Sequence, residues 1–243
     1  MTSPTLSSPA ESYADHVERS LRTLALVLPR FRPALTRVLG QDDLDVTLET
    51  AVRFHDLGKL TEAWQERLGH GLRLPAHATL GASHLWRVMP EPYRGPMSFA
   101  VAIHHSDRGL LGDNIEKPDV RAILDGIIAH NTGLIRWDER ARTLPDALFP
   151  KEASHMTLGD LHGFARGLRT WARGGSFMEQ HTRRIRAMLV HHVLKLCDIA
   201  AASERRDWEG EKSELDESNL YGGWLMVRQL TDYVASLGTE ADA

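Results

Sequence analysis

The chain has 243 residues, of which 42% are hydrophobic and 26% charged, the proportions of a soluble globular protein that can bury a core. Its formal net charge of -4 excludes a uniformly basic nucleic-acid binder, so a polyanion would have to bind through a local basic patch or through bound metal cations. A single cysteine excludes an internal disulfide framework, and no apolar run approaches the roughly 20 residues that span a bilayer, so we expect a cytoplasmic protein with no membrane contact.

The predicted elements are helices. Residues 1–10 are rich in Ser, Thr and Pro and are expected to be disordered. Apolar spacing then predicts a helix over residues 11–28, ended by Pro29 and Pro33, and a second over 45–60 with Gly58 near its end. Further helices are predicted over residues 63–68, 76–88, 97–105, 122–130, 158–171, 179–205 and 221–237, with a surface loop at 206–219. Because no alternating strand pattern of useful length is present, the predicted fold is all-α, with a single globular domain over residues 11–243.

The adjacent pair His55-Asp56 is the first candidate for chemistry. Neighbouring residues lie about 100° apart around a helix axis, so both side chains can turn toward one pocket. An imidazole and a carboxylate together suit a divalent transition metal. Lys59, four residues after His55, lies on the same helical face, where its charge can hold a phosphate oxygen. An isolated His-Asp pair is more often a helix cap or a surface hydrogen bond, so other residues have to decide.

Other ionisable residues stand among apolar neighbours. His104-His105 end the apolar run of residues 99–103, and two imidazoles are costly to bury without partners. Asp198 lies within the apolar pattern of the long late helix and needs a metal or a cation, although a helix cap or a local salt bridge is the alternative. His16 lies in the first predicted helix, and His77 opens a later one.

These residues carry a resemblance to a known family. In chain order, His16, His55-Asp56 and Asp198 follow the H…HD…D pattern, so the chain resembles the HD superfamily of metal-dependent phosphohydrolases. Three further motifs narrow the resemblance: His55-Asp-Leu-Gly-Lys59, His77-Ala-Thr-Leu-Gly-Ala-Ser83 and His104-His105. Together they look like the HD nuclease of type I CRISPR systems, which is fused to or partnered with a Cas-three helicase. The stretch from residue 195 to 204 is similar to that family's closing motif.

The resemblance implies an all-α HD nuclease domain that cuts single-stranded DNA by two-metal phosphodiester hydrolysis. By resemblance, one ion would be held by His16, His55, Asp56 and Asp198, and a second by Asp56 as the bridge together with His77, His104 and His105. Asp56 and Lys59 would be the catalytic residues, with Lys59 orienting or neutralising the phosphate. The family's metals are Mn, Co, Ni or Fe, with Mg in some members, and histidine-rich ligation favours the transition metals.

The expected partners follow from what the sequence lacks. No G-x-x-x-x-G-K-[ST] phosphate loop is present, so the chain would act as a stand-alone nuclease subunit. It would then need a separate helicase subunit and an RNA-guided surveillance complex to receive a displaced single strand. Arg67, Arg73 and Arg108 are candidates to track that strand, although a solvated surface role is as good an interpretation. Trp64 and Trp86 can stack on bases, but a core role is favoured for each.

Two details of the motifs stay open. The family often has glycines after the double histidine, whereas this chain has Ser106-Asp107-Arg108-Gly109, which leaves the substrate edge of the site undefined. His84 follows His77 by two helical turns and competes with it for the role of ligand. We favour His77 because Gly81-Ala82 follow it as they do in the family.

Three hypotheses follow for the function. The first is the two-metal nuclease. The second is a single-metal HD phosphohydrolase that acts on nucleotides or small phosphate esters, which would have less need of His77 and the double histidine. The third is a non-catalytic helical adaptor that kept the scaffold, against which the intact set of costly buried ligands argues.

Overall fold

The structure is a computed structural model that describes residues 3–40, 42–105, 118–203, 229 and 232–237. Its helices in chain order are α1 (Tyr13–Leu39), α2 (Leu44–Phe54), α3 (Glu62–Gly69), α4 (Ala78–Val88), α5 (Arg94–Ala102), α7 (Pro118–Leu124), α8 (Leu158–Arg173) and α9 (Phe177–Ser203). Short 3-10 helices are η1 (Leu57–Leu60), η3 (Ala141–Thr143) and η4 (Lys151–His155). The only sheet among the described residues is the hairpin of β1 (Leu6–Ser8) and β2 (Glu11–Ser12), so the prediction of an all-α fold is confirmed.

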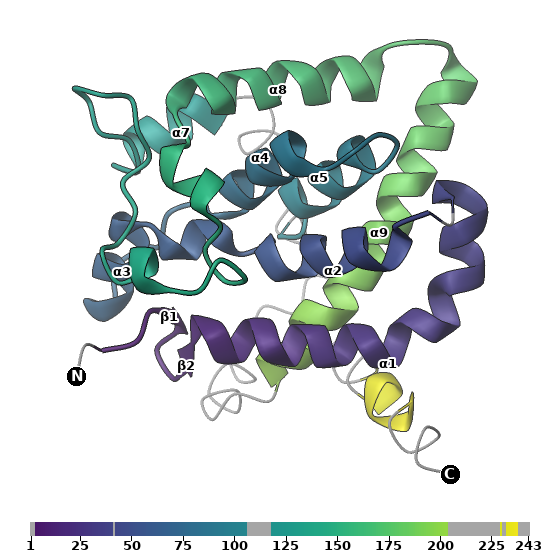
Figure 1. The fold of residues 1–243 in the computed structure, drawn as a ribbon, viewed down its shortest axis with the longest axis horizontal. Helices are drawn as coiled ribbons and strands as arrows, with labels where there is room; N and C mark the ends of the chain where they lie inside the picture. The colour runs from purple at the N-terminus through teal and green to yellow at the C-terminus, as the bar shows by residue number, and fades with distance from the viewer. Residues whose placement is uncertain (1–2, 41, 106–117, 204–228, 230–231, 238–243) are drawn as a thin grey trace.

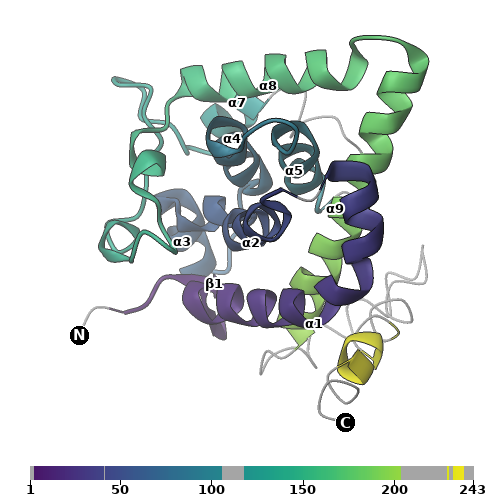
Figure 2. The same cartoon turned by 45° about the vertical axis from the view of Figure 1, so that its right-hand side comes forward.

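The helices surround α2, which lies near the middle of the molecule. Figure 2 shows α2 almost end-on, with α1 and α9 on two sides and α4, α5 and α8 above it. The long helices α1 and α9 pack along each other, α5 packs against both α4 and α9, and α8 lies across α4 and α5 (Figure 1). A layered helical core of this kind buries the end of α2, which is where the HD pair lies. None of the described helices combines the length and the apolar content that a bilayer crossing requires.

Helix α1 continues past the two prolines that were expected to end it. Pro29 and Pro33 lie inside the helix, and Figure 1 shows α1 bending in its second half. A proline removes one helical hydrogen bond and bends the helix, but it does not have to end it. Leu35 and Leu39 are buried beyond the prolines, so tertiary packing keeps the last turns helical.

The predicted helix over residues 45–60 is wrong in its second half. Helix α2 ends at Phe54, His55 caps it, and η1 follows from Leu57. Asp56 connects the two with φ -98° and ψ 13°, a bridge conformation that often occurs at active sites. His55 and Lys59 therefore do not share one helical face.

The N-terminal segment differs from the expected disorder. Leu6–Ser8 and Glu11–Ser12 form the antiparallel hairpin, and Thr5, Ser7 and Ser8 are buried. The expectation rested on composition, whereas the strand is held by contacts distant in sequence: the Gln65 side chain accepts a hydrogen bond from Leu6 N and donates one to Leu6 O. Residues 1 and 2 lie outside the described residues.

The irregular segment after α7 braces the HD turn. The helix predicted over residues 122–130 ends early, because Gly126 adopts a positive φ of 73° and Ile128 then pairs with Ile135. Further along, Asp138 N donates to Leu60 O at 3.0 Å, and Thr61 forms a bridge with Trp137. Of the remaining predictions, the loop at 206–219 lies outside the described residues, as does most of the helix at 221–237.

Candidate metal centre

The end of α2 sets the direction of the first imidazole. His55 Nδ1 donates to Val52 O at 2.6 Å, a carbonyl in the last turn of the helix. Because Nδ1 carries the proton, Nε2 is left with its lone pair and faces the interior. Both His55 and the following Asp56 have no exposed surface. A helix C-terminus thus fixes one metal-binding atom in place.

His104 is held by the same device on another helix. It follows the end of α5, and its Nδ1 donates to Val101 O at 2.6 Å. This imidazole is also fully buried, with Nε2 directed toward Asp56 at 3.4 Å from Oδ1. Two helix ends therefore present two Nε2 atoms to one carboxylate.

Two glycines allow the helix that follows His77 to approach this turn. A Cβ on Gly58 would lie 2.3 Å from the backbone oxygen of His77, and a Cβ on Gly81 would lie 2.4 Å from the backbone oxygen of Phe54. Contacts this short are not tolerated, so any larger residue would push α4 away from the HD turn. The glycines of both sequence motifs are therefore needed for the close packing that brings His77 to Asp56.

One carboxylate oxygen of Asp56 faces a first group of side chains. Asp56 Oδ2 lies 3.2 Å from His16 Nε2 and 3.4 Å from His55 Nε2. Asp198 completes this group from α9, with its Oδ1 at 3.4 Å from His16 Nε2 and 3.7 Å from His55 Nε2. These four residues form one of two groups among the described residues whose ligand atoms are close enough to share a metal ion.

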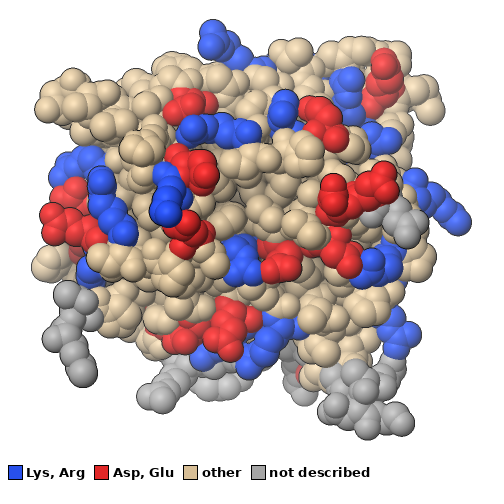
Figure 3. Space-filling model, in the orientation of Figure 1, with Lys and Arg blue, Asp and Glu red and all other residues tan. Residues whose placement is uncertain are grey.

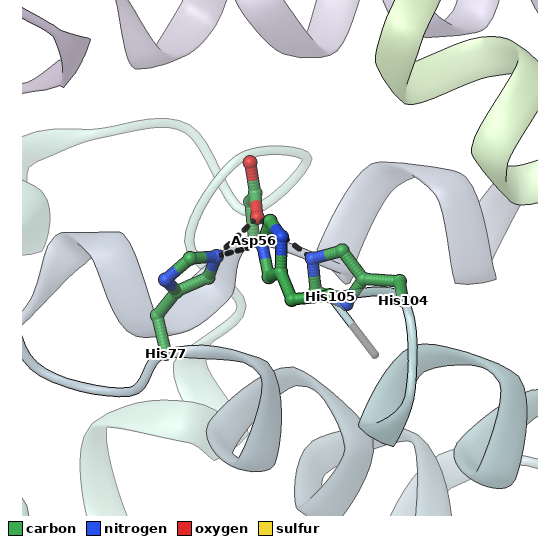
Figure 4. A group of neighbouring side chains, drawn as sticks. All are labelled: Asp56, His77, His104 and His105. Atoms are coloured by element: carbon green, nitrogen blue, oxygen red, sulfur yellow. Dashed lines mark hydrogen bonds and ion pairs between the residues drawn. The ribbon is translucent and has the colours of Figure 1, made fainter. Parts of the chain in front are cut away.

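The other oxygen of Asp56 faces the second group. Asp56 Oδ1 lies 3.0 Å from His77 Nε2, and His105 Nε2 lies 2.7 Å from the same nitrogen of His77. Figure 4 shows the rings of His77, His104 and His105 gathered around the carboxylate. Asp56 is thus shared by the two groups, one oxygen to each.

The atoms at the centre fit a cation. Five buried polar atoms in the two groups have no hydrogen-bond partner of good geometry: His16 Nε2, His55 Nε2, Asp56 Oδ1, Asp56 Oδ2 and His104 Nε2. Buried polar atoms left in this way are costly unless something else satisfies them. Imidazole nitrogens and carboxylate oxygens are ligands that divalent transition metals accept, so both groups could bind metal.

Electrostatics keeps most of these side chains in the form that binds metal. Burial by itself raises the pKa of Asp56, but His55 and Lys59 outweigh burial and hold that pKa well below its ordinary value. Burial likewise opposes ionisation of Asp198, whose pKa is held well below its ordinary value by hydrogen bonds with His16 and His55. Burial lowers the pKa of His77 to about 4, so this imidazole is neutral near pH 7.

His16 is the exception. Burial lowers its pKa, but hydrogen bonds with the carboxylates of Asp198, Asp56 and Glu11 outweigh burial and raise the pKa to about 10. A proton therefore occupies the space between these carboxylates, and a bound cation would take its place. Competition of this kind makes metal binding release protons.

Lys59 stands beside the shared carboxylate. Its Nζ lies 2.6 Å from Asp56 Oδ2 and 5.6 Å from the centroid of the Trp64 ring, and the residue is 8% exposed. The Trp64 ring packs edge-on against the ring of His77. Trp64 is buried, as expected, so it supports the site from beneath and is not an exposed platform for bases.

Several sequence candidates lie elsewhere. His84 belongs to neither group: it is buried in α4 against Phe54. His77 precedes that helix, so the two histidines do not share a helical face. Arg67 is engaged with Asp125, donating to its backbone oxygen at 2.8 Å, and Arg73 is exposed. Arg108 and the rest of residues 106–109 lie outside the described residues.

Sequence reasoning missed Glu11, a buried carboxylate whose Oε2 lies 3.1 Å from His16 Nδ1. Its position five residues before His16 gave no periodic signal, because Glu11 lies in β2 and His16 lies in α1. A hint was available only in its spacing from Ser12, the N-cap of α1, which shows that Glu11 must lie at the helix entrance.

An all-helical domain that gathers the H…HD…D residues at its centre has the organisation of the HD superfamily, as the motifs predicted. No family model matches the chain. The chain is similar to the CRISPR-associated endonuclease Cas3-HD of Thermoproteus tenax, with 27% identity over 202 residues that cover 80% of this chain and 86% of the relative. The predicted resemblance to the HD nucleases of CRISPR systems is therefore confirmed, and the chain is a homologue of that endonuclease.

Proposed function

We propose that the chain is a metal-dependent nuclease of CRISPR type I interference that cuts single-stranded DNA with two metal ions. The observation that carries the two-metal part is the division of Asp56, which directs one oxygen toward each of two ligand groups. A single-metal phosphohydrolase would need only the group that contains His16 and Asp198. The name of the relative, a CRISPR-associated endonuclease, supports the choice of DNA cleavage over hydrolysis of a small ester.

The proposed ligands are those that the motifs predicted. One ion would be held by His16, His55, Asp56 and Asp198, and the other by Asp56, His77, His104 and His105. When loaded, such a site supplies Lewis-acid polarisation of a phosphodiester and positive charge for its oxygens. The nitrogen-rich ligand set favours Mn, Ni, Co or Fe over Mg.

The protein's own contribution is positioning and charge. Asp56 is held ionised, so it can orient a nucleophilic water as an acceptor on the side away from Lys59. The Lys59 ammonium can leave Asp56 Oδ2 for a phosphate oxygen without crossing the site, because the two residues are only three apart in the turn. The ring of Trp64 beside Lys59 keeps water away from this charge and strengthens its interaction with a phosphate.

The proposed substrate is a single strand received from a partner. Figure 3 shows Lys and Arg interspersed with Asp and Glu on the face drawn, with no continuous basic track across it. A chain with a net charge of -4 and such a face does not gather long DNA by surface charge alone. Delivery by a separate helicase subunit and an RNA-guided surveillance complex would supply the strand at high local concentration.

Circular single-stranded DNA provides the decisive assay. Metal-stripped protein is incubated with the circle after addition of Mn, Ni or Mg separately, and we expect degradation with a transition metal but not in chelator. Asp56→Ala should abolish degradation. His84→Asn is the matched control, because His84 is a buried histidine of α4 outside both ligand groups. If nucleotides are hydrolysed while the circle survives every metal, the single-metal phosphohydrolase replaces this proposal.

A further inference from the structure

A buried carboxylate stands behind the metal centre, on the side away from Asp56. Glu11 lies in β2 of the N-terminal hairpin and is 3% exposed. Glutamate is rarely buried to this degree unless it has charged or hydrogen-bonding partners. The sequence motifs of the site do not include it, so its burial calls for a separate explanation.

The partners of Glu11 connect it to a proposed ligand. Ser7 Oγ donates to Oε2 at 2.7 Å, and Arg19 Nη1 donates to Oε1 at 2.9 Å. The same Oε2 lies 3.1 Å from His16 Nδ1, although the N–H direction departs from that of an ideal hydrogen bond. Contacts of this kind commonly tighten only when a site is loaded. Every contact made by the carboxylate is thus with a group that can donate a proton, which suits the ionised form of Glu11.

The orientation of His16 differs in kind from that of two other proposed ligands. His55 and His104 each donate Nδ1–H to a backbone carbonyl, a neutral acceptor. His16 instead faces a carboxylate. A charged acceptor behind an imidazole fixes the tautomer, makes the other nitrogen a stronger ligand and stabilises the positive charge that a metal places on the ring.

We propose that Glu11 is a positioning residue of the metal centre: it holds His16 with its proton on Nδ1 and strengthens cation binding by the group of His16, His55, Asp56 and Asp198. This inference rests on the proposed metal site but not on the choice of DNA as substrate. It assigns a working role to the N-terminal hairpin, because Glu11 acts only where that hairpin holds it.

The hairpin is fixed to the same turn that carries Lys59. Gln65 Nε2 donates to Leu6 O at 2.8 Å and to Lys59 O at 2.7 Å, so one amide joins β1 to η1. Tyr13 N donates to Thr5 O at 2.9 Å and closes the hairpin onto the start of α1. Glu11 is therefore held between two anchored segments and cannot swing away from His16.

Metal affinity of the Glu11→Gln variant tests this role. This change keeps the shape of the side chain and removes its charge. We expect metal-stripped Glu11→Gln, titrated with Mn²⁺ by calorimetry, to bind its tighter ion about 10–100-fold more weakly than the wild type. Glu18→Gln is the matched control, because it removes the same charge from the exposed face of α1, two residues after His16. We expect Glu18→Gln to bind as the wild type does. A folded Glu11→Gln protein with wild-type affinity would overturn the proposal.

A measurement on the wild type covers the case in which Glu11→Gln does not fold. Protein with ¹⁵N-labelled histidine is loaded with diamagnetic Zn²⁺, and the tautomer of His16 is read from its ring nitrogens by NMR. We expect the metal on Nε2 and the proton on Nδ1, and metal on Nδ1 would overturn the proposal. Neither measurement uses DNA, so a protein that binds metal in this way but leaves every DNA intact refutes the proposed nuclease and not the role of Glu11.

Discussion

Asp56 is the residue on which the chemistry depends. It has no exposed surface, and it lies within 3.4 Å of His16, His55, His77 and His104 through its two oxygens. A buried carboxylate is tolerated only because so many partners surround it, and removing it would leave several imidazoles and Lys59 without compensation. One side chain therefore holds the two ligand groups together and neutralises the charge beside them.

Replacing Lys59 separates its proposed catalytic role from metal binding. Lys59→Ala removes a cation next to the proposed metal position, so repulsion of the metal falls while stabilisation of the phosphate is lost. We expect cleavage of circular single-stranded DNA to fall about 10²–10³-fold, the usual cost of losing one such charged donor. Metal affinity, measured by calorimetry, should stay the same or increase.

Lys151→Ala provides the control for that prediction, because the Lys151 side chain is 83% exposed and pairs only with Asp146 in the described contacts. It should leave both quantities unchanged. A parallel loss of metal affinity and cleavage in Lys59→Ala would instead mean that Lys59 supports the structure of the site.

At the scale of elements, the site depends on backbone segments that nearly touch. The HD turn after α2 and the start of α4 approach at Gly58 and Gly81, where an added Cβ would lie 2.3–2.4 Å from backbone oxygens. Backbone atoms cannot move aside as a flexible side chain can. The two glycines therefore act through the distance between elements and not through any contact with metal or substrate.

We expect Gly58→Ala and Gly81→Ala each to lower the free energy of unfolding by roughly 1–3 kcal/mol, the cost of forcing extra atoms into a packed interior. Both variants should also bind metal more weakly, because α4 can no longer hold His77 beside Asp56. Urea denaturation of the metal-free protein measures the first effect, and calorimetry measures the second.

Gly163→Ala is the matched substitution within α8, where an added Cβ meets nothing within 4 Å. Replacing glycine in an open helical position should raise stability by about 0.4–1 kcal/mol, since the unfolded chain loses freedom. If all three alanine variants behaved alike, close packing at Gly58 and Gly81 would not be the reason for those glycines.

At the scale of the whole molecule, the metal-free fold carries an electrostatic cost at its centre. Helices α1, α2, α5 and α9 all converge on the buried polar atoms of the two ligand groups. A cation that binds the folded chain and not the unfolded one stabilises the whole domain by mass action. Stability should therefore depend on metal even though no ligand lies at the surface of the core.

We expect Mn²⁺ at about 100 times its dissociation constant to stabilise the protein by about 2.7 kcal/mol, and so to raise Tm by roughly 5–10 °C. Differential scanning calorimetry with and without chelator measures the shift. Asp56→Asn should lose nearly all of it, because both ligand groups share that carboxylate. A shift of wild-type size in Asp56→Asn would place the stabilising ion elsewhere.

Much of the chemistry could be predicted from the sequence. The apolar periodicity of α8 and α9 gave helices whose limits differ from the prediction by a few residues, because long amphipathic patterns depend on local order. All seven predicted ligands lie in the two groups that could bind metal, although their roles remain predictions. Residue type was enough to select them, since imidazoles and carboxylates in apolar surroundings need a partner.

Predictions failed where distant contacts override local signals. Pro29 and Pro33 were expected to end α1, but packing of Leu35 keeps it helical. The Ser- and Pro-rich N-terminus was expected to be disordered, but Gln65 holds it through hydrogen bonds. Local composition reports the preference of an isolated segment, and it contains no information on a partner 59 residues away.

The sequence by itself determined that this protein is helical and that it carries an H…HD…D set with three further histidines, because these properties reside in residue type and order. Only the tertiary structure decided that Asp56 turns one oxygen to each ligand group, that His77 and not His84 meets it, and that Glu11 lies behind His16. The physical reason is that these contacts join the hairpin and the ends of separate helices. Their distances are set by close packing, including the two glycine contacts, and no spacing along the chain encodes them.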